Sequence, residues 1–257
     1  MKICAAQCRP IAGDIAKNIE SHRSLIELAV SQRADLIFFP ELSLTGYEPA
    51  LAKELATHSD DSRWDVFQEW SDTYTIIIGV GLPLVTDKSD AARRDVSQQG
   101  TGIQIGMIFF QPGQPRVRYA KQQLHSDELP FFAPGREQLL LRTSGHTLVP
   151  AVCYESLQPN HAADAARCGA DIYLASVAKP DREVAKAFAH YRAIARQHSM
   201  TVLMANSLGP CDNFISAGQS AVWNNSGELV AQLNDRDEGL LLFDTTTGGA
   251  NTVAQNV

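Results

Sequence analysis

The sequence lacks any apolar run long enough to cross a membrane. A membrane-spanning helix needs about 20 predominantly apolar residues, and no run in the 257-residue chain comes near that length. The opening residues, MKICAAQCRP, contain a run that is too short and too polar for a signal peptide. We therefore expect a cytoplasmic protein with no membrane partner.

Clusters of basic residues are missing as well. Lys and Arg together number 22 against 29 Asp and Glu, which gives a formal net charge of -7 at pH 7. No long Lys/Arg block occurs in the chain. Because nucleic-acid binding depends on concentrated positive charge, we expect no nucleic-acid partner.

The five cysteines form no C-x-x-C pair, and their number is odd. A chain of this length with such cysteines is not typical of a disulfide framework, so we expect reduced thiols. A buried free cysteine usually behaves as a small hydrophobic residue. We assign that packing role to Cys4, Cys8 and Cys168, and we expect Cys211, in GPCDN, to be a loop thiol.

Several catalytic signatures are also absent. The chain has no G-x-x-x-x-G-K-[ST] loop, no G-x-G-x-x-G after its first apolar segment and no G-x-S-x-G. These absences argue against P-loop nucleotide chemistry, a Rossmann cofactor and a serine-hydrolase elbow. The seven histidines show no metal-binding spacing. A cysteine–histidine pair stays open, because such partners meet in space and not in sequence.

Apolar strand-like segments alternate with helical patterns in the first part of the chain and again from about 147 to 206. Hairpin-like segments fill the middle and the end, and 86–100 is expected to be a surface loop. This pattern indicates an α/β domain with a mixed sheet. Expected strands cover 2–7, 35–40, 75–83, 101–110, 116–120, 139–142, 146–153, 171–178, 201–207, 220–224, 227–233 and 239–244; expected helices cover 14–30, 63–72, 159–168 and 183–199.

One carboxylate directly follows an apolar strand. In FFPELSLTGYEP, Glu41 comes after Phe38, Phe39 and Pro40. The carboxyl end of a buried strand is where α/β proteins bind their ligands. An isolated Pro-Glu pair would be an exposed loop acid. Burial against the two phenylalanines would instead raise the pKa of Glu41 and suit it to general-base catalysis.

A lysine and a second glutamate share the stretch RYAKQQLHSDELPFFAPG. Lys121 follows a short alternating strand, and Glu128 precedes the aromatic pair Phe131 and Phe132. A lone lysine is usually a solvated surface charge, but burial among apolar neighbours would require a compensating anion. Glu41 and Glu128 are the candidates for that anion.

A thiol stands where a strand gives way to a turn. Cys153, in PAVCYESL, ends the expected strand at 146–153, ahead of the helix expected at 159–168. Backbone N–H groups at such a turn lack helical partners. They could lower the pKa of the thiol and donate to an oxyanion, which makes Cys153 the candidate nucleophile.

Together these stretches resemble the Glu–Lys–Cys signature of the nitrilase superfamily of carbon–nitrogen hydrolases. The matches are PELSLTGY around Glu41, YAKQQL around Lys121 and VCYE around Cys153, in the family's order. The family's additional glutamate matches Glu128 in DELPFFAPG. The resemblance runs from MKICAAQ to GLLLFD. It implies one domain over residues 1–257 of fold class α/β, a four-layer αββα sandwich.

The resemblance also implies a role for each residue. Glu41 would deprotonate Cys153, whose thiolate would attack an amide, carbamoyl or nitrile carbon. Lys121 and the backbone N–H of Tyr154 would stabilise the oxyanion, and Glu128 would hold Lys121 or orient the substrate. The implied substrate is a small amide or N-carbamoyl compound. The resemblance further implies no metal, no organic cofactor and a homodimer or larger homo-oligomer.

Some positions depart from the pattern of relatives. Gln122 and Gln123 stand where many amidases have a histidine after the lysine. Ser176, in DIYLASVAK, stands where relatives contribute a strand end to the pocket, so we expect it to bind substrate. We expect Lys179 to be a plain surface charge, as most lone lysines are. The alternative is that Lys179 binds an acidic group of the substrate.

Other functions use the same residues. The stretch from GDIAKNIE to PELSLTGYEP resembles the ammonia-generating domain of glutamine-dependent NAD synthetases. Those chains carry a further ATP-using domain, for which 257 residues leave no room. Amidase or carbamoylase activity is our first hypothesis, with glutaminase and nitrilase activity as alternatives. Intact Glu41, Lys121 and Cys153 argue against a catalytically silent scaffold.

Overall fold

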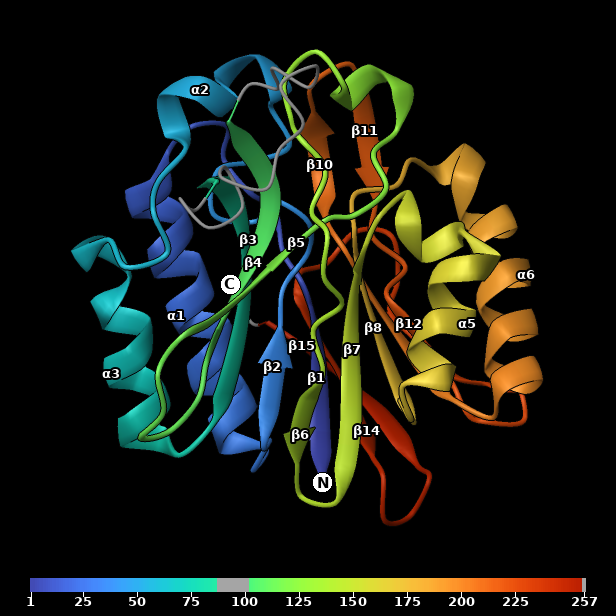
Figure 1. Ribbon diagram of the computed structural model, residues 1–257. Coiled ribbons are helices and arrows are strands. Elements are labelled where there is room, and N and C mark those ends of the chain that lie inside the picture. Colours follow the sequence, from blue (N-terminus) through green and yellow to red (C-terminus); the bar gives the residue numbers. More distant parts are fainter. Residues whose placement is uncertain (87–101, 256–257) are drawn as a thin grey trace.

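The computed structural model describes residues 1–86 and 102–255, so nearly all of the loop expected at 86–100 lies outside the described residues. Two β-sheets face each other in the middle of the molecule, and helices cover the outer face of each (Figure 1). The four layers follow from strands that are apolar on both faces, because such strands must be covered on both sides.

The first sheet has seven strands in the order β15-β14-β1-β2-β3-β4-β5. Strands β1, β2 and β3 are parallel, and the other pairings are antiparallel. In chain order, its strands are β1 (Lys2–Gln7), β2 (Leu36–Phe38), β3 (Ile77–Val85), β4 (Ile103–Phe110), β5 (Val117–Ala120), β14 (Gly239–Asp244) and β15 (Ala250–Ala254).

The second sheet has six strands in the order β13-β12-β9-β8-β7-β6, with β7, β8 and β9 parallel. Its strands are β6 (Leu141–Thr143), β7 (His146–Val152), β8 (Ile172–Val177), β9 (Thr201–Asn206), β12 (Ala221–Trp223) and β13 (Leu229–Gln232). Strands β10 (Leu208–Cys211) and β11 (Phe214–Ala217) form a separate hairpin.

Helices α1 (Ile15–Ser31) and α3 (Asp65–Tyr74) cover the first sheet, and α5 (Pro159–Arg167) and α6 (Asp181–His198) cover the second (Figure 1). The Asp14 carboxylate accepts the Lys17 N–H, so Asp14 is the N-cap of α1. The short helices are α2 (Ala52–Leu55), η1 (Pro49–Leu51), η2 (Ser62–Trp64), η3 (Ser126–Glu128) and η4 (Glu155–Leu157). No helix within the described ranges is long and apolar enough to cross a membrane.

Three hydrophobic clusters correspond to the three spaces between the four layers. One joins the two sheets and includes Phe38, Phe109 and Leu203. The second packs α1 and α3 against the first sheet, and the third packs α5 and α6 against the second. The expected αββα sandwich is therefore confirmed.

The expectations for two cysteines were wrong. Cys211 is 1% exposed, because it ends β10 and β10 pairs with β11. The glycine and proline beside it had suggested a loop. Cys168 is exposed at the C-cap of α5, where a helix end turns toward solvent and leaves the residue unpacked. Cys4 and Cys8 are buried as expected.

Candidate active site

Glu41 lies in a turn that follows β2 and is supported by β3. Gly81 lies so close to this turn that a side-chain carbon there would come within 2.6 Å of the Pro40 carbonyl oxygen and 2.7 Å of the Leu42 nitrogen. The Ser43 N–H donates to the same Pro40 oxygen at 3.2 Å. A glycine at 81 therefore lets the turn lie against the sheet, with Glu41 buried at 1% exposure.

Lys121 follows β5 and is the centre of a buried cluster of charges. Its backbone is fixed on both sides, because its N–H donates to Ile105 O at 2.9 Å and its carbonyl accepts the Gly135 N–H at 2.7 Å. Its ammonium lies 2.7 Å from Glu41 Oε1 and 2.6 Å from Glu128 Oε1. Burying a charge is costly unless it is paired. The two glutamates expected to compensate Lys121 both do so.

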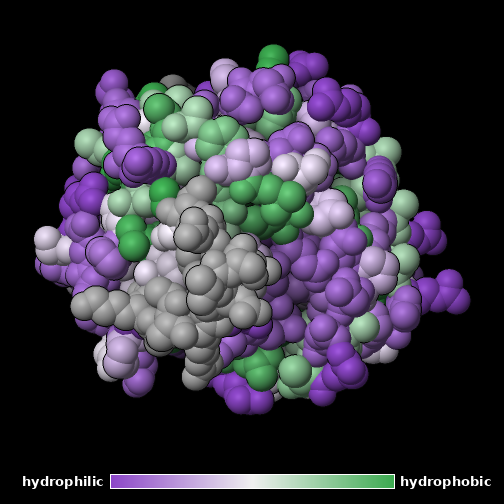
Figure 2. Space-filling model, turned by 45° about the horizontal axis from the view of Figure 1, so that its top comes forward, coloured by the Kyte–Doolittle hydropathy of each residue, from purple (hydrophilic) through white to green (hydrophobic). Residues whose placement is uncertain are grey.

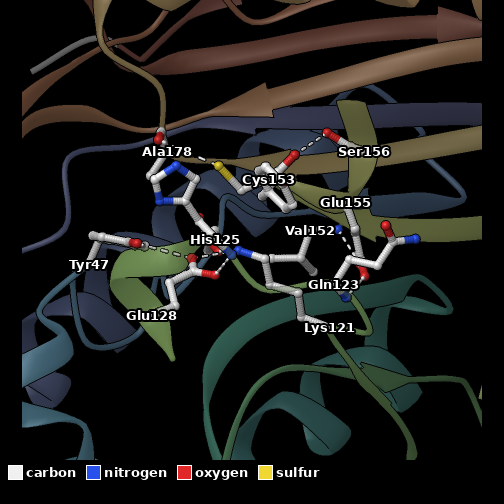
Figure 3. A network of polar contacts seen from close by, with 12 residues as sticks. Tyr47, Lys121, Gln123, His125, Glu128, Val152, Cys153, Glu155, Ser156 and Ala178 are labelled. Carbon is white, nitrogen blue, oxygen red and sulfur yellow. Dashed lines mark hydrogen bonds and ion pairs between the residues drawn. The ribbon is translucent and has the colours of Figure 1, made fainter. Parts of the chain in front are cut away.

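Glu128 is itself held in place from two directions. It ends η3, where its Oε2 accepts the backbone N–H of His125 at 2.8 Å. Its Oε1 accepts the Tyr47 hydroxyl at 3.0 Å as well as the Lys121 ammonium. Figure 3 shows Tyr47 and Lys121 reaching Glu128 from different sides. Glu128 thus fixes where the Lys121 ammonium lies.

Cys153 is the first residue after β7 and has a left-handed backbone, with φ at 46°. Its N–H donates to Ser176 O at 3.0 Å, which continues the pairing with β8. Its carbonyl accepts the Ser156 N–H at 3.1 Å and the Ser156 hydroxyl at 2.6 Å. Non-glycine residues seldom adopt a positive φ, so these contacts hold an unfavourable turn. The turn leaves the thiol half-buried in a pocket wall.

The pKa values of these groups are shifted by their burial and their neighbours. Burial raises the pKa of Glu41 to about 7, against the lowering effect of Lys121. Burial and the charge of Glu41 raise the pKa of Cys153 to about 12. Burial lowers the pKa of Lys121, but Glu41 and Glu128 outweigh this and raise it above its ordinary value. The resting site therefore contains a neutral thiol and a permanently charged ammonium.

The two oxygens of Glu41 have different surroundings. Oε1 accepts from Lys121, whereas Oε2 is buried with no partner at hydrogen-bond distance among the described residues. The Cys153 thiol is close enough to be one of the groups that lower the Glu41 pKa. A carboxyl with a pKa near neutrality and one free oxygen can accept a thiol proton.

Glu155 is a buried residue to which the sequence analysis gave no role. Its Oε1 accepts the Tyr119 hydroxyl and the Val152 N–H, each at 2.7 Å. Its Oε2 accepts the backbone N–H groups of Gln122 at 2.6 Å and Gln123 at 3.2 Å. Part of this network is visible in Figure 3. Glu155 therefore ties the segment after Lys121 to the segment before Cys153. The backbone of the Gln122–Gln123 pair is thereby held against the Glu155 carboxylate.

The expected binding residues differ in their location. Tyr154 lines the pocket beside Cys153, and its ring contacts that of His125 with centroids 5.4 Å apart. Ser176 is fully buried and is not part of the pocket wall. Its hydroxyl donates to Phe39 O at 2.8 Å, which joins the second sheet to the segment that carries Glu41.

The expectation that Lys179 is a surface charge was wrong. Lys179 is 1% exposed, and its Nζ lies 3.8 Å from Cys153 Sγ. It follows β8, which is parallel to β7 and paired with it, so the residues after the two strands meet at the same edge of the sheet. One weak signal of this position is present in the sequence, a lysine that comes soon after a strand of buried apolar residues.

A pocket of about 710 Å³ opens over Cys153. Its wall combines charged and aromatic side chains from several loops and from the start of α6. Figure 2 views the end of the molecule at which α6 begins, where hydrophobic side chains gather near the middle of the face. The lining residues are Tyr47, Pro49, His125, Asp127, Glu128, Phe131, Cys153, Tyr154, Leu157, Gln158, Ala178, Lys179, Pro180, Arg182, Glu183, Lys186, Asp212, Asn213 and Phe214.

No group of three or more His, Cys, Asp or Glu side chains in the described ranges is arranged to hold a metal ion. The acidic side chains at Cys153 are instead paired with Lys121. The site is thus a buried network of two carboxylates and an ammonium, with a thiol that faces a pocket.

Comparison with known proteins places the chain in a family. The carbon-nitrogen hydrolase family matches residues 2–254. The chain therefore belongs to the carbon-nitrogen hydrolases of the nitrilase superfamily, as its motifs predicted.

Individual relatives are distant. The glutamine-dependent NAD(+) synthetase of Acinetobacter baylyi is 26% identical over 90% of this chain and 41% of its own length. Nitrilase 1 of Arabidopsis thaliana is 23% identical over 96% of this chain and 79% of its own length. The chain thus spans about two fifths of the length of the NAD synthetases it matches.

Among solved structures, a variant of the amidase from Nesterenkonia sp. AN1 has the same fold. Its TM-score is 0.82 at 23% identity, and the match covers 95% of this chain and 92% of the amidase. In that structure acrylamide has added to the active-site cysteine. The likeness bears on the fold of this chain and not on its substrate.

Proposed function

We propose that this protein hydrolyses the C–N bond of a small amide or N-carbamoyl compound through a thioester on Cys153. One observation carries the proposal: the buried cluster of Glu41, Lys121 and Glu128 adjoins a half-buried thiol in the wall of a pocket. An ion pair with a purely structural role would not need to lie beside a thiol that a small molecule can reach through the pocket. The pocket volume is in the range typical of small-molecule sites.

In the first half of the proposed reaction, Glu41 Oε2 takes the thiol proton and Cys153 Sγ bonds to the carbonyl carbon. The Lys121 ammonium and the Tyr154 backbone N–H donate to the resulting oxyanion. The C–N bond then breaks, and Glu41 passes its proton to the departing ammonia or amine. Glu128 takes no proton in this scheme, because its role is to hold Lys121.

In the second half, Glu41 accepts a proton from a water molecule that attacks the thioester carbon. Collapse of this intermediate breaks the C–S bond and releases the carboxylic acid. The proton on Glu41 returns to the thiolate, which restores the resting state. A group that acts in turn as base and acid works best with a pKa near the working pH, and the value of about 7 for Glu41 meets that condition.

Glutamine is a second candidate substrate. Several relatives are glutamine-dependent NAD(+) synthetases, and this chain covers only part of their length. The side-chain amide of glutamine is a small primary amide that suits the same chemistry. Nitriles are a third candidate, because Nitrilase 1 also matches most of the chain.

An ammonia-release screen tests the proposed function. Wild-type protein is incubated with linear amides, N-carbamoyl amino acids, glutamine and nitriles. Cys153→Ala serves as the inactive variant, and Cys168→Ala serves as the matched control because Cys168 is exposed and remote from the pocket. We expect release by the wild type and by C168A but not by C153A. Release from no compound would favour the silent scaffold, and equal release by C153A would rule out a thioester on Cys153.

We also propose that the chain works as a homodimer or larger homo-oligomer, as the resemblance implies. Sedimentation velocity over a range of protein concentrations measures the mass directly. A species of 28.0 kDa at all concentrations, the mass of one chain, would contradict the proposal.

A further inference from the structure

A second buried lysine lies at the sulfur of Cys153. Lys179 Nζ is 3.8 Å from Cys153 Sγ, and the sulfur lies 3.7 Å from the carbonyl oxygen of Ala178. The contact with Ala178 is drawn in Figure 3. Sγ therefore lies against the segment that leads from β8 into α6. The mechanism above gives this segment no role.

The backbone of Lys179 is held by the neighbouring strands. Its N–H donates to Asn206 Oδ1 at 2.8 Å. Its carbonyl oxygen accepts from Asn206 Nδ2 at 3.2 Å, from the Ala217 N–H at 2.9 Å and from the Ser216 hydroxyl at 3.2 Å. A side chain that starts from so fixed a backbone loses less freedom when its end is held at one point.

Lys179 differs from Lys121 in having no close carboxylate. Lys121 has two within 2.7 Å, whereas no carboxylate of the described residues forms an ion pair with Lys179. Burial lowers the pKa of Lys179, but Cys153, Tyr191 and Glu183 together raise it above its ordinary value, so the side chain stays charged. A buried charge without a partner is unfavourable. An anion at Cys153 Sγ would remove that cost.

The charges of the cluster also favour such an anion. Once Glu41 holds the thiol proton, Glu128, Lys121 and the thiolate together carry one net negative charge. Adding Lys179 brings the cluster to neutrality. Of the two lysines, Lys179 lowers the pKa of Cys153 more.

We propose that Lys179 is a catalytic residue whose ammonium is the ion-pair partner of the Cys153 thiolate, distinct from the oxyanion role of Lys121. In this step the thiol proton moves to Glu41, the negative charge moves from Glu41 to Sγ, and Lys179 keeps its three protons. The assignment rests on the proposed function, in which Cys153 is the nucleophile. It gives the site two lysines with separate tasks.

Alkylation of Cys153 by iodoacetamide tests this role without a substrate. The rate is followed by mass spectrometry of the Cys153 peptide from pH 6 to 10 in wild type, Lys179→Met, Lys179→Arg and the surface control Lys17→Met. We expect K179M to react about tenfold or more slowly at neutral pH, the change that corresponds to one pKa unit. K179R and K17M should remain close to wild type. The polar variant Lys179→Gln replaces K179M if the latter does not fold.

Two results would overturn the proposal. One is an alkylation profile in K179M, or in K179Q, that superimposes on that of wild type. The other is a K179M rate that falls with anionic iodoacetate but not with neutral iodoacetamide, which would make Lys179 a binding group for substrate anions. Failure of the proposed function has a different signature, because wild-type protein would then release no ammonia whatever its alkylation profile.

Discussion

At the scale of single residues, the two carboxyl oxygens of Glu41 have different roles. Oε1 is bound by Lys121, which keeps the carboxyl in place, and Oε2 is buried with no hydrogen-bond partner among the described residues. Complete burial makes ionisation of Glu41 less favourable than in water. The result is a carboxyl that can hold a proton near neutral pH and release it again, as each half of the proposed reaction requires.

We predict that kcat/KM rises with pH through about 7 and levels off above it. The reason is that Glu41 must be unprotonated to accept the thiol proton, and burial raises its pKa to about 7. Glu41→Gln should lose about a hundredfold or more in kcat, the usual contribution of a general base. The measurement is the pH profile of the best substrate from the ammonia-release screen.

Thermal unfolding provides the control for this variant. The amide oxygen that E41Q introduces can still accept from Lys121, so the variant should unfold within a few degrees of wild type. Activity of E41Q within tenfold of wild type, or a flat wild-type profile between pH 6 and 8, would remove Glu41 from the role of base.

Sequence reasoning found some residues of the site and missed others for a physical reason. Glu41 and Cys153 follow apolar strands and Lys121 follows a short alternating strand, so their position at strand ends could be predicted. Glu155 stands among polar residues, where an acid is ordinarily solvated. Lys179 precedes a proline at a helix start and resembles a surface lysine. Their burial depends on contacts between distant segments, which local patterns do not contain.

At the scale of elements, Glu155 connects the exits of β5 and β7. All four of its hydrogen-bond partners act as donors, and three of them are backbone N–H groups on the two exits. A carboxylate accepts at both oxygens. A glutamine in its place would point its NH₂ group at a backbone N–H whichever way the amide is turned, and two donors cannot form a hydrogen bond with each other. Glu155 is therefore a positioning residue for Lys121 and Cys153.

We predict that Glu155→Gln lowers kcat about tenfold or more and changes KM little, because the proposed nucleophile and oxyanion donor shift while the pocket wall stays. An unsatisfied buried donor costs roughly 1–3 kcal/mol, so some stability is lost as well. Tyr119→Phe is the graded control, since it removes one of the four donors and leaves the carboxylate. Steady-state kinetics of both variants measure the effect. A kcat of E155Q equal to that of wild type would contradict the prediction.

At the scale of the whole molecule, the αββα arrangement brings the site together. Glu41 and Lys121 follow strands of the first sheet, and Cys153 and Lys179 follow strands of the second. The layers and most strands could be predicted from the sequence, since strands with two apolar faces need cover on both sides. The β10–β11 hairpin could not, because Gly209, Pro210 and the exposed Ile215 resemble a loop.

The same burial makes the stability of the molecule depend on pH. Burial raises the pKa of Glu155 from its ordinary value to about 7. The folded protein therefore holds this proton more tightly than the unfolded chain, so the free energy of unfolding falls as the pH rises through 7. Between pH 6 and 8, the titration of Glu155 should lower the free energy of unfolding by on the order of 1 kcal/mol.

We predict that Glu155→Gln removes this contribution from the pH dependence of stability, because the amide does not titrate. Urea unfolding of wild type, E155Q and Y119F at pH 6 and pH 8 measures the difference. Y119F keeps the carboxyl and should retain the wild-type loss of stability, even if its absolute stability is lower. Glu41, whose pKa burial also raises to about 7, and His161 beside Glu155, whose pKa burial lowers to about 4, add pH dependences of their own. Because all three proteins keep both groups, these contributions cancel in the difference between wild type and E155Q. An equal pH difference in wild type and E155Q would mean that Glu155 is ionised in the folded protein throughout.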